Sequence, residues 1–109
     1  MLNNLERGDI VWIDFVPNKG SQLRPALVIS PEKYNSISGL VLVCPINNKS
    51  EGYFFEVAID LLELSKDKFF VLVDQIRSFD IKKQVKKKSG KINKNELDEV
   101  WAKITLLTN

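Results

Sequence analysis

The first part of the chain carries apolar side chains on both faces of a pattern that repeats every second residue. In the segment GDIVWIDF, Ile10 and Trp12 share one face, while Val11, Ile13 and Phe15 share the other. A period of two with β-branched residues is typical of a β-strand. Because both faces are apolar, we expect this strand to be buried on two sides or to form part of a barrel wall.

Further apolar runs predict more strands, separated by polar turns. They read ALVIS, LVLVCPI, FFEVAI and FFVLVDQIRS, and we expect LVLVCPI to end as a strand at Pro45. The segment VPNKGSQLRP, which contains Arg24, is predicted to be a loop because it contains Pro, Asn, Gly and Ser. PEKYNSISG is turn-like with room for one helical turn, INNKSEGY is a polar loop, and DLLELSKDK indicates no single element.

The periodicity changes near the C-terminus, where apolar residues recur every three or four positions. Asn93 followed by Glu96 fits a capping box in which Asn replaces the usual Ser or Thr. The stripe that follows predicts an amphipathic helix packed on the sheet, and it consists of Leu97, Val100, Trp101, Ile104 and Leu107. About five to seven short strands and one terminal helix predict a mainly β protein, a small β-barrel with a helical cover.

The composition narrows the class of protein. A length of 109 residues fits a single domain, residues 1–109. Neither a secretion signal nor an apolar run near the roughly 20 residues that span a membrane is visible, so we expect a cytoplasmic protein with no membrane partner. The single cysteine, Cys44, fits a reducing compartment and a buried core thiol. With no histidine and one cysteine we expect no zinc site, while an all-carboxylate magnesium site stays open.

Positive charge is concentrated in one segment. Eight of the 16 lysines and arginines lie between Arg77 and Lys94, where Asp80 is the single acid, and the rest of the chain is mildly acidic. Such a stripe favours a polyphosphate ligand. The alternative is a solvated, lysine-rich loop, and the charge pattern alone does not decide between the two.

Two segments carry short motifs in a distinctive order. Residues 8–35 hold Gly-Asp, an apolar strand ending at Asp-Phe, a Pro-Asn-Lys-Gly loop, Arg-Pro, a second strand, Ser-Pro and Tyr-Asn. Residues 43–78 hold Cys-Pro, a polar loop, and later Asp-Gln followed by a basic residue and Ser. This order, with a helix at the C-terminus, resembles the MazF/PemK family of toxins from type II toxin–antitoxin systems. The likeness spans most of the chain.

The resemblance implies a fold, an activity and partners. The fold is an SH3-like barrel that forms a homodimer, and the activity is sequence-selective cleavage of single-stranded RNA, in the cell mRNA. Such toxins use no metal or other cofactor. Their nucleophile is the ribose 2′-hydroxyl, and they leave a 2′,3′-cyclic phosphate and a 5′-hydroxyl. A cognate antitoxin neutralises them by occupying the RNA groove.

The proposed chemistry singles out two residues as catalytic. Cleavage by the 2′-hydroxyl needs an acceptor for its proton, groups that stabilise charge on the phosphorane, and a proton donor for the 5′-oxygen. Arg24 is the best phosphate ligand, because its planar guanidinium can hold two phosphate oxygens. Without the resemblance we favour the other interpretation, a surface arginine that bonds a carbonyl. The resemblance places the second catalytic position, usually Thr or Ser, on Asn47.

Asn47 departs from the family pattern. An amide can donate a hydrogen bond to a phosphate oxygen, but it has no hydroxyl and does not titrate. Three interpretations stay open: an active enzyme with Asn47 as oxyanion donor, a slow enzyme, or an RNA-binding protein that has lost catalysis. Ser50 lies three residues further on and substitutes for the hydroxyl only if the loop is rearranged.

Further residues are candidates for RNA binding. The predicted set is Lys19, Gln22, Asn48, Gln75, Arg77, Lys82, Lys83, Lys86 and Lys87. The lysines add salt-dependent affinity that is independent of sequence, and Arg77 contacts either a phosphate or a base. For Asp74 we favour a structural role in which its carboxylate holds a loop. Trp12 and Phe15 are able to stack on bases, although strand aromatics more often belong to a core.

Two other classes of protein compete with an RNA-cleaving toxin. Gyrase-poisoning toxins of the same fold depend on an aromatic residue near the C-terminus, whereas here the nearest, Trp101, falls on the predicted buried stripe. An SH3-like adaptor needs an aromatic groove for Pro-rich peptides, and the sequence does not cluster surface aromatics in that way.

Overall fold

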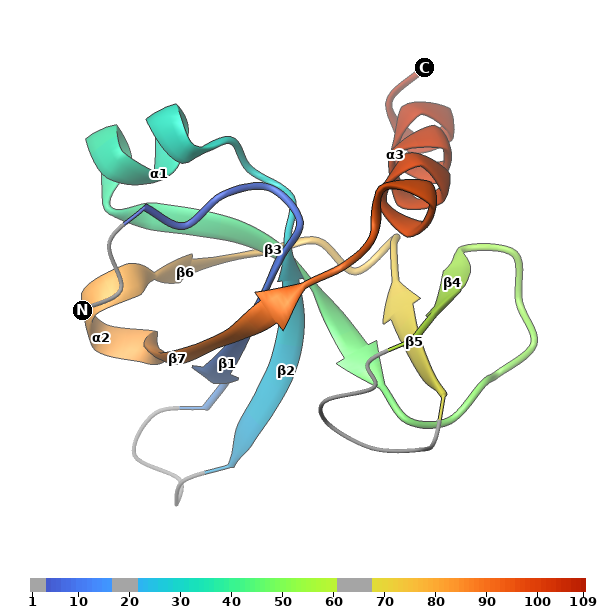
Figure 1. Cartoon of the computed structure of the whole chain (residues 1–109), viewed down its shortest axis with the longest axis horizontal. Helices are drawn as coiled ribbons and strands as arrows, with labels where there is room; N and C mark the ends of the chain where they lie inside the picture. Colours follow the sequence, from blue (N-terminus) through green and yellow to red (C-terminus); the bar gives the residue numbers. More distant parts are fainter. Residues whose placement is uncertain (1–3, 17–21, 61–67) are drawn as a thin grey trace.

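The computed structural model describes residues 4–16, 22–60 and 68–109. In chain order its elements are β1 (Asp9–Asp14), β2 (Leu23–Val28), α1 (Glu32–Ser38), β3 (Leu40–Asn47), β4 (Glu56–Ile59), β5 (Phe69–Leu72), β6 (Arg77–Asp80), α2 (Ile81–Gln84), β7 (Val85–Lys91) and α3 (Lys94–Thr108) (Figure 1).

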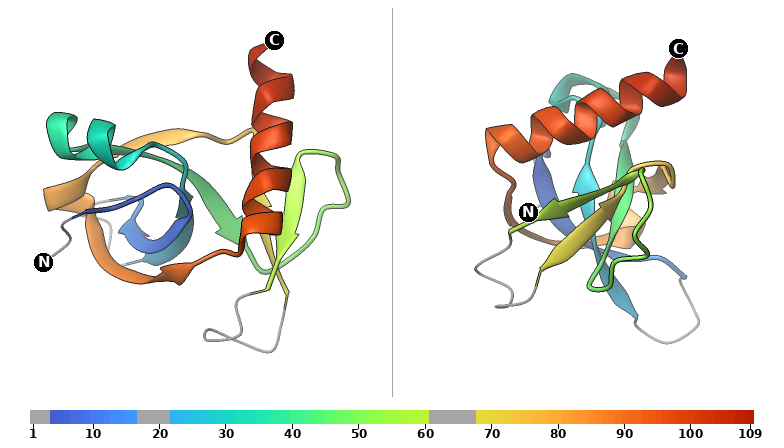
Figure 2. Two further views of the ribbon diagram at one scale, coloured as in Figure 1. Left: turned by 45° about the horizontal axis from the view of Figure 1, so that its top comes forward. Right: turned by 90° about the vertical axis from the view of Figure 1, so that its right-hand side faces the viewer.

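The described residues form one strongly curled antiparallel sheet of seven strands. The order is β4-β5-β3-β2-β1-β7, and β6 pairs with the first half of β3. The sheet is barrel-like without closing, and α3 lies beside β4 and β5 (Figure 2). The mainly β fold with a C-terminal helix is therefore confirmed.

Strand β3 runs through Pro45 and does not end there, contrary to the expectation. Its first half, up to Val43, pairs with β6, and its last two residues, Ile46 and Asn47, pair with β5. Pro45 lies at the change from one partner to the other, so its missing N–H removes no ladder hydrogen bond on that side. On the opposite side Pro45 faces Ala26 of β2.

Two hydrophobic cores lie on the two faces of the curled sheet. The inner core, enclosed by β1, β2, β3, β6 and β7, includes Val11, Ile13, Phe15, Val28, Val43, Phe79 and Val85. The outer core, between the other face and α3, includes Ile10, Leu27, Cys44, Ile46, Val71, Val100 and Ile104. The alternation of Ile10 with Val11 thus places neighbours in different cores, as expected for a barrel wall. Cys44 is fully buried, as predicted.

Helix α3 has the predicted start but a narrower buried stripe. The Asn93 side chain accepts from the Glu96 backbone N–H at 2.8 Å, and the Glu96 carboxylate accepts from the Asn93 N–H at 3.3 Å. Val100 and Ile104 are buried, whereas Trp101 is 39% exposed. The prediction of a buried Trp101 was wrong because the ring lies outside the outer core: one part of it contacts the Arg7 guanidinium, whose Cζ is 4.1 Å from the ring centroid, and the rest faces solvent.

The Ser-Pro and Tyr-Asn motifs build a buried polar anchor. The Ser30 hydroxyl donates to the Asn35 side-chain oxygen, and Asn35 Nδ2 donates to the Leu5 carbonyl at 2.8 Å. The Leu42 N–H donates to the Ser30 hydroxyl at 3.0 Å. Because each polar atom has a partner, this anchor stabilises the N-terminal segment against α1 without a buried unpaired group.

Two segments differ from the sequence-based expectation. PEKYNSISG forms the seven-residue helix α1, which ends at Gly39 with a φ of 72°, a left-handed conformation that favours glycine. The basic stretch forms α2, with Asp80 as its cap, and then β7. Most of DLLELSKDK lies outside the described residues. Within the described part of the chain, no helix has the length and apolarity to cross a membrane.

Candidate functional site

The two predicted catalytic side chains meet at the rim of the inner core. Arg24 lies in β2, not in a loop as expected, and pairs with Ile13 of β1. The β2–β3 ladder ends at Ala26 opposite Pro45, which brings Arg24 beside Asn47 two residues further along. Arg24 Nη2 donates to Asn47 Oδ1 at 2.7 Å. Both side chains are half-buried, so they are held by the sheet and still reach solvent.

This hydrogen bond fixes the orientation of the Asn47 amide. Because Oδ1 accepts from Arg24, the Nδ2 group points away from the guanidinium and is the half of the amide that can donate to a ligand. The remaining N–H groups of Arg24 are directed by the same contact. The pair therefore presents several donors and one positive charge at one point, which suits an anion such as a phosphodiester.

Phe15 lies beneath Arg24 and is shared with a second arginine. The Arg24 Cζ is 5.1 Å from the Phe15 ring centroid, and the Arg77 Cζ is 5.2 Å from the same centroid. Arg77 also lies 4.9 Å from the ring of Phe79, which packs against Phe15 with centroids 4.7 Å apart. The sequence pattern predicted separate roles for Arg77 and Phe15 and did not indicate that their side chains are neighbours. The Arg-Ser-Phe spacing, with Arg77 and Phe79 on one face of β6, was the available signal.

A loop stabilised by Glu56 follows Asn47. The Ser50 hydroxyl donates to the Glu56 carboxylate, and the backbone N–H groups of Glu51 and Gly52 donate to it at 3.0 and 3.2 Å. These bonds lower the pKa of Glu56, with the bond from Ser50 as the largest cause. Ser50 is therefore engaged with Glu56 and is not placed beside Arg24 as a substitute hydroxyl. Asn48 is exposed at the start of this loop.

Asp74 and Gln75 lie on the connection from β5 to β6. The Tyr53 hydroxyl donates to the Asp74 carboxylate, which raises the pKa of Tyr53 to about 12. The Asp74 carboxylate thus ties its connection to the β3–β4 loop through the Tyr53 side chain. The Gln75 N–H donates to the Leu72 carbonyl at 3.2 Å, and its side chain is exposed.

The lysines of the basic segment separate into two groups. Lys88 and Lys91 lie 3.4 Å from the buried carboxylate of Asp9, and Lys91 also contacts Glu6 at 3.0 Å. These contacts, above all the hydrogen bond to Glu6, raise the pKa of Lys91. The four lysines in the predicted RNA-binding set, Lys82, Lys83, Lys86 and Lys87, are all exposed on α2 and β7.

The register shows how far these lysines lie from the arginine. Val85 pairs with Ile13, and Ile13 pairs with Arg24, so β7 is two strands away from β2. At about 4.8 Å per strand this is about 10 Å. Lys86 and Lys87 follow Val85 directly. The backbone of the basic segment therefore lies about 10 Å from that of Arg24. Lys87 pairs with Trp12, so its side chain is on the opposite face of the sheet from Ile13 and Arg24.

The other predicted residues have mixed outcomes. Lys19 lies outside the described residues, and Gln22 is exposed just before β2. Phe15 is only 7% exposed, so its ring belongs to the core, whereas Trp12 is half-buried in β1. Within the described ranges, no three side chains of His, Cys, Asp or Glu come together as a metal ion would need.

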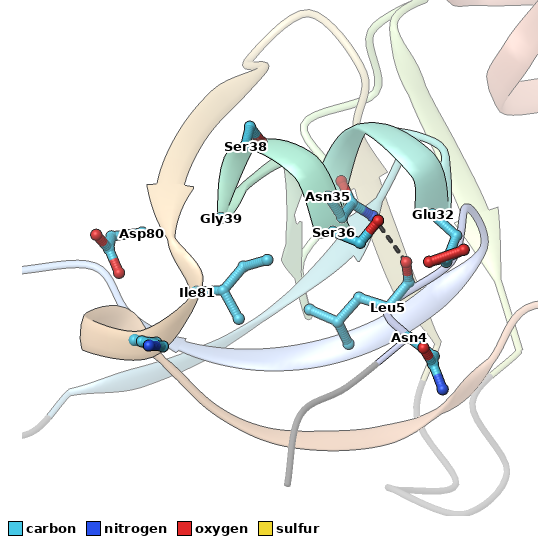
Figure 3. Close-up of a pocket in the computed structure, with 10 residues that line it drawn as sticks. Asn4, Leu5, Glu32, Asn35, Ser36, Ser38, Gly39, Asp80 and Ile81 are labelled. Atoms are coloured by element: carbon cyan, nitrogen blue, oxygen red, sulfur yellow. Dashed lines mark hydrogen bonds between the residues drawn. The ribbon is translucent and has the colours of Figure 1, made fainter.

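A cavity of about 750 Å³ lies elsewhere, between α1, α2 and the N-terminal segment (Figure 3). Its lining includes Glu32, Asn35, Asp80 and Ile81, and of the predicted site residues only Lys82. Asn35 points across the cavity to the Leu5 carbonyl, in the anchor described above. This cavity is therefore separate from the cluster formed by Arg24, Asn47 and Arg77.

Comparison with known proteins identifies the family. Residues 6–108 match the family described as PemK-like, MazF-like toxin of type II toxin-antitoxin system. The endoribonuclease toxin MazF of Escherichia coli (strain K12) is 37% identical over 105 residues, which is 94% of this chain and 92% of that protein. The endoribonuclease toxin ChpB of the same strain is 35% identical over 95 residues, 81% of this chain and 80% of that protein.

Solved structures agree. A MazE–MazF crystal structure from Deinococcus radiodurans matches with a TM-score of 0.81 and 33% identity, over 96% of each chain. A crystal structure of MazF from the same organism matches with a TM-score of 0.79 and 32% identity, over 96% of this chain and 97% of that one. The chain belongs to the PemK-like, MazF-like toxin family of type II toxin–antitoxin systems.

Proposed function

We propose that this protein is an endoribonuclease toxin that cleaves single-stranded mRNA sequence-selectively and is neutralised by a cognate antitoxin. The relatives MazF and ChpB are named endoribonuclease toxins, and one matching structure is a MazE–MazF complex. The observation that carries the proposal is the contact between Arg24 Nη2 and Asn47 Oδ1. It assembles a cationic fork and an amide donor at a half-buried point beside an exposed basic segment.

The proposed reaction needs no metal or cofactor. The ribose 2′-oxygen attacks the adjacent phosphorus, the bond from phosphorus to the 5′-oxygen breaks, and the products are a 2′,3′-cyclic phosphate and a 5′-hydroxyl. Arg24 binds the non-bridging oxygens, and Asn47 Nδ2 donates to the oxygen that gains charge in the phosphorane. Guanidinium and carboxamide groups are in general poor proton donors and acceptors near neutral pH. Water therefore accepts the 2′-proton and protonates the 5′-oxygen.

The remaining predicted residues extend the binding surface. Gln22 and Asn48 lie within two residues of Arg24 and Asn47 along the chain, Arg77 shares the Phe15 ring with Arg24, and Gln75 lies two residues before Arg77. We assign to the four exposed lysines the attraction of the RNA backbone on either side. A homodimer would form a groove from two copies of this surface, and the antitoxin would compete for it with an acidic segment that folds on binding. Cytoplasmic mRNA is the substrate that this assignment implies.

The test is cleavage of a long single-stranded RNA by purified protein in excess EDTA. An Arg24→Ala variant and a Lys94→Ala control, which removes an exposed charge on α3, are run in parallel. We expect cutting by the parent and the control, 5′-hydroxyl ends, and no cutting by Arg24→Ala. Activity that appears only when Mg²⁺ is restored would contradict the metal-independent mechanism.

One observation favours a second function, a catalytically silent RNA-binding toxin homologue. Asn47 stands where the family usually has a hydroxyl, and Ser50 is held by Glu56. RNA that is bound but left intact by the parent chain would support this alternative. Cleavage restored by Asn47→Thr would then show that the missing hydroxyl is the reason.

A further inference from the structure

The aromatic ring of Phe15 contacts two cations at the candidate site. Phe15 follows β1 and is 7% exposed, with its ring tilted by 56° against Phe79. The Cζ atoms of Arg24 and Arg77 lie 5.1 and 5.2 Å from its centroid. The two guanidinium groups are therefore within about 10 Å of each other, although they come from different strands, β2 and β6.

Two positive charges on one ring repel each other in the absence of an anion. The face of the ring attracts each guanidinium through its quadrupole, which offsets part of this repulsion and restricts the positions of both groups. Arg24 is held at a second point by the Asn47 amide oxygen, and Arg77 is held by the ring of Phe79. Each arginine thus has two contacts that orient it and keeps further N–H donors for a ligand.

We propose that Phe15 is a positioning residue for RNA cleavage, whose ring holds Arg24 and Arg77 at the spacing of the scissile phosphate and its neighbour. The inference rests on the proposed function and adds to it. In this proposal Arg77 is the second phosphate ligand and does not contact a base. Phe15 touches neither phosphate and acts through the two guanidinium groups.

A packing role alone makes a different prediction. An aliphatic residue of similar size would fill the inner core nearly as well, but it lacks the negative face that attracts a cation. Fluorination of the ring removes that negative face and leaves its shape almost unchanged. Replacement of Phe15 by phenylalanines with one, two and three ring fluorines therefore separates electrostatics from packing.

The experiment measures single-turnover cleavage of an RNA oligonucleotide, and binding of the same oligonucleotide with a 2′-deoxyribose at the cut. The proteins are the parent, the fluorinated series, Phe15→Leu, Arg77→Gln and the double variant. Phe79→Leu is the comparison for the contribution of Arg77, because Phe79 contacts Arg77 and packs against Phe15. We expect the cleavage rate to fall with each fluorine and about tenfold in Phe15→Leu, with unchanged thermal stability in the fluorinated proteins.

The double variant, which combines Phe15→Leu with Arg77→Gln, measures the energetic coupling between Phe15 and Arg77. If Phe15 acts through the arginines, the loss caused by Phe15→Leu is smaller in the Arg77→Gln background than in the parent. Phe79→Leu should weaken binding no more than Arg77→Gln does. Equal cleavage and binding across the fluorinated series, or a Phe15→Leu loss that is the same in both backgrounds, would overturn the proposal.

The binding measurement distinguishes this inference from the proposed function. If the parent chain binds the deoxy-substituted RNA but cleaves no RNA, the proposed catalytic function is wrong. The role of Phe15 still predicts in that case that fluorination weakens RNA binding. If the parent cleaves RNA and fluorination changes neither rate nor affinity, only the role of Phe15 fails. The fluorinated proteins keep the test decisive even if Phe15→Leu does not fold.

Discussion

Arg24 Nη2 donates to Asn47 Oδ1 at 2.7 Å, across 23 residues of sequence. The contact determines which half of the Asn47 amide faces a ligand. Its oxygen is used by the arginine, so its nitrogen is the donor that remains. A residue that lacks the hydroxyl usual at this position can therefore contribute a hydrogen bond to a phosphate while it orients the neighbouring cation.

Exchanging the Asn47 amide for a carboxylate tests this assignment. Asn47→Asp keeps an oxygen for Arg24, removes the Nδ2 donor and adds a negative charge beside the phosphate. We expect single-turnover RNA cleavage to fall by about 100-fold or more, as when one oxyanion donor is removed. Asn47→Thr, which supplies a hydroxyl donor, should keep or raise the rate. Unchanged cleavage by Asn47→Asp would show that Nδ2 does not contact the phosphate.

The exposed lysines of α2 and β7 should account for much of the salt dependence of RNA binding. A variant with four Lys→Gln substitutions tests this, at Lys82, Lys83, Lys86 and Lys87. We expect the slope of log affinity against log salt concentration to fall by about 0.7 for each lysine that contacts a phosphate. Lys94→Gln is the control, because Lys94 pairs with Asp98 within α3 at 2.8 Å. Fluorescence anisotropy over a salt series measures the slopes, and equal slopes for all proteins would remove the lysines from the binding surface.

Asn35 should contribute to stability and not to catalysis. Asn35→Ala removes a bond to the Leu5 carbonyl and leaves the buried Ser30 hydroxyl without its acceptor, so we expect a loss of about 2–3 kcal/mol in the free energy of unfolding. Ser36→Ala, one position further on the exposed side of α1, should cost close to nothing. Urea denaturation measures both, and cleavage per folded molecule should match the parent. A normal stability for Asn35→Ala would refute the anchor.

The buried thiol of Cys44 predicts a loss of stability in alkali. Burial, assisted by the charge of Asp74, raises the pKa of Cys44 from 9.0 to about 12. Since the folded chain holds this proton more tightly than the unfolded chain, the stabilisation is complete below pH 9 and is lost as the pH rises towards 12. Between pH 8 and 10.5 the parent should lose about 2 kcal/mol more than Cys44→Ala. Equal losses in urea titrations at the two pH values would contradict this.

Local signals in the sequence were sufficient for part of the fold. The Asn93–Glu96 capping box is made by residues three positions apart, and the alternation in β1 depends only on the geometry of one strand. Likewise, the order of motifs indicated the family and, through it, Arg24 and Asn47. Each of these inferences uses interactions within a few residues or a pattern preserved along the chain.

Other features depend on which strands become neighbours. Arg24 belongs to β2 because Ile13 pairs with it, although its local sequence resembles a loop. Pro45 is tolerated within β3 because the partner strand changes beside it. Trp101 packs against Arg7, far away in sequence, and not against the outer core as its place in the helical pattern predicted. In each case a contact between distant residues overrides the local preference.

The candidate site shows the same division. The sequence by itself determined that a guanidinium and an amide were available, and that lysines were concentrated near the C-terminal half. Only the tertiary structure decided that Asn47 accepts from Arg24, that Ser50 is engaged by Glu56, and that Phe15 lies under two arginines. The physical reason is that hydrogen bonds and cation–π contacts act over a few ångströms. Their partners are selected by strand register in the curled sheet, which local sequence patterns do not specify.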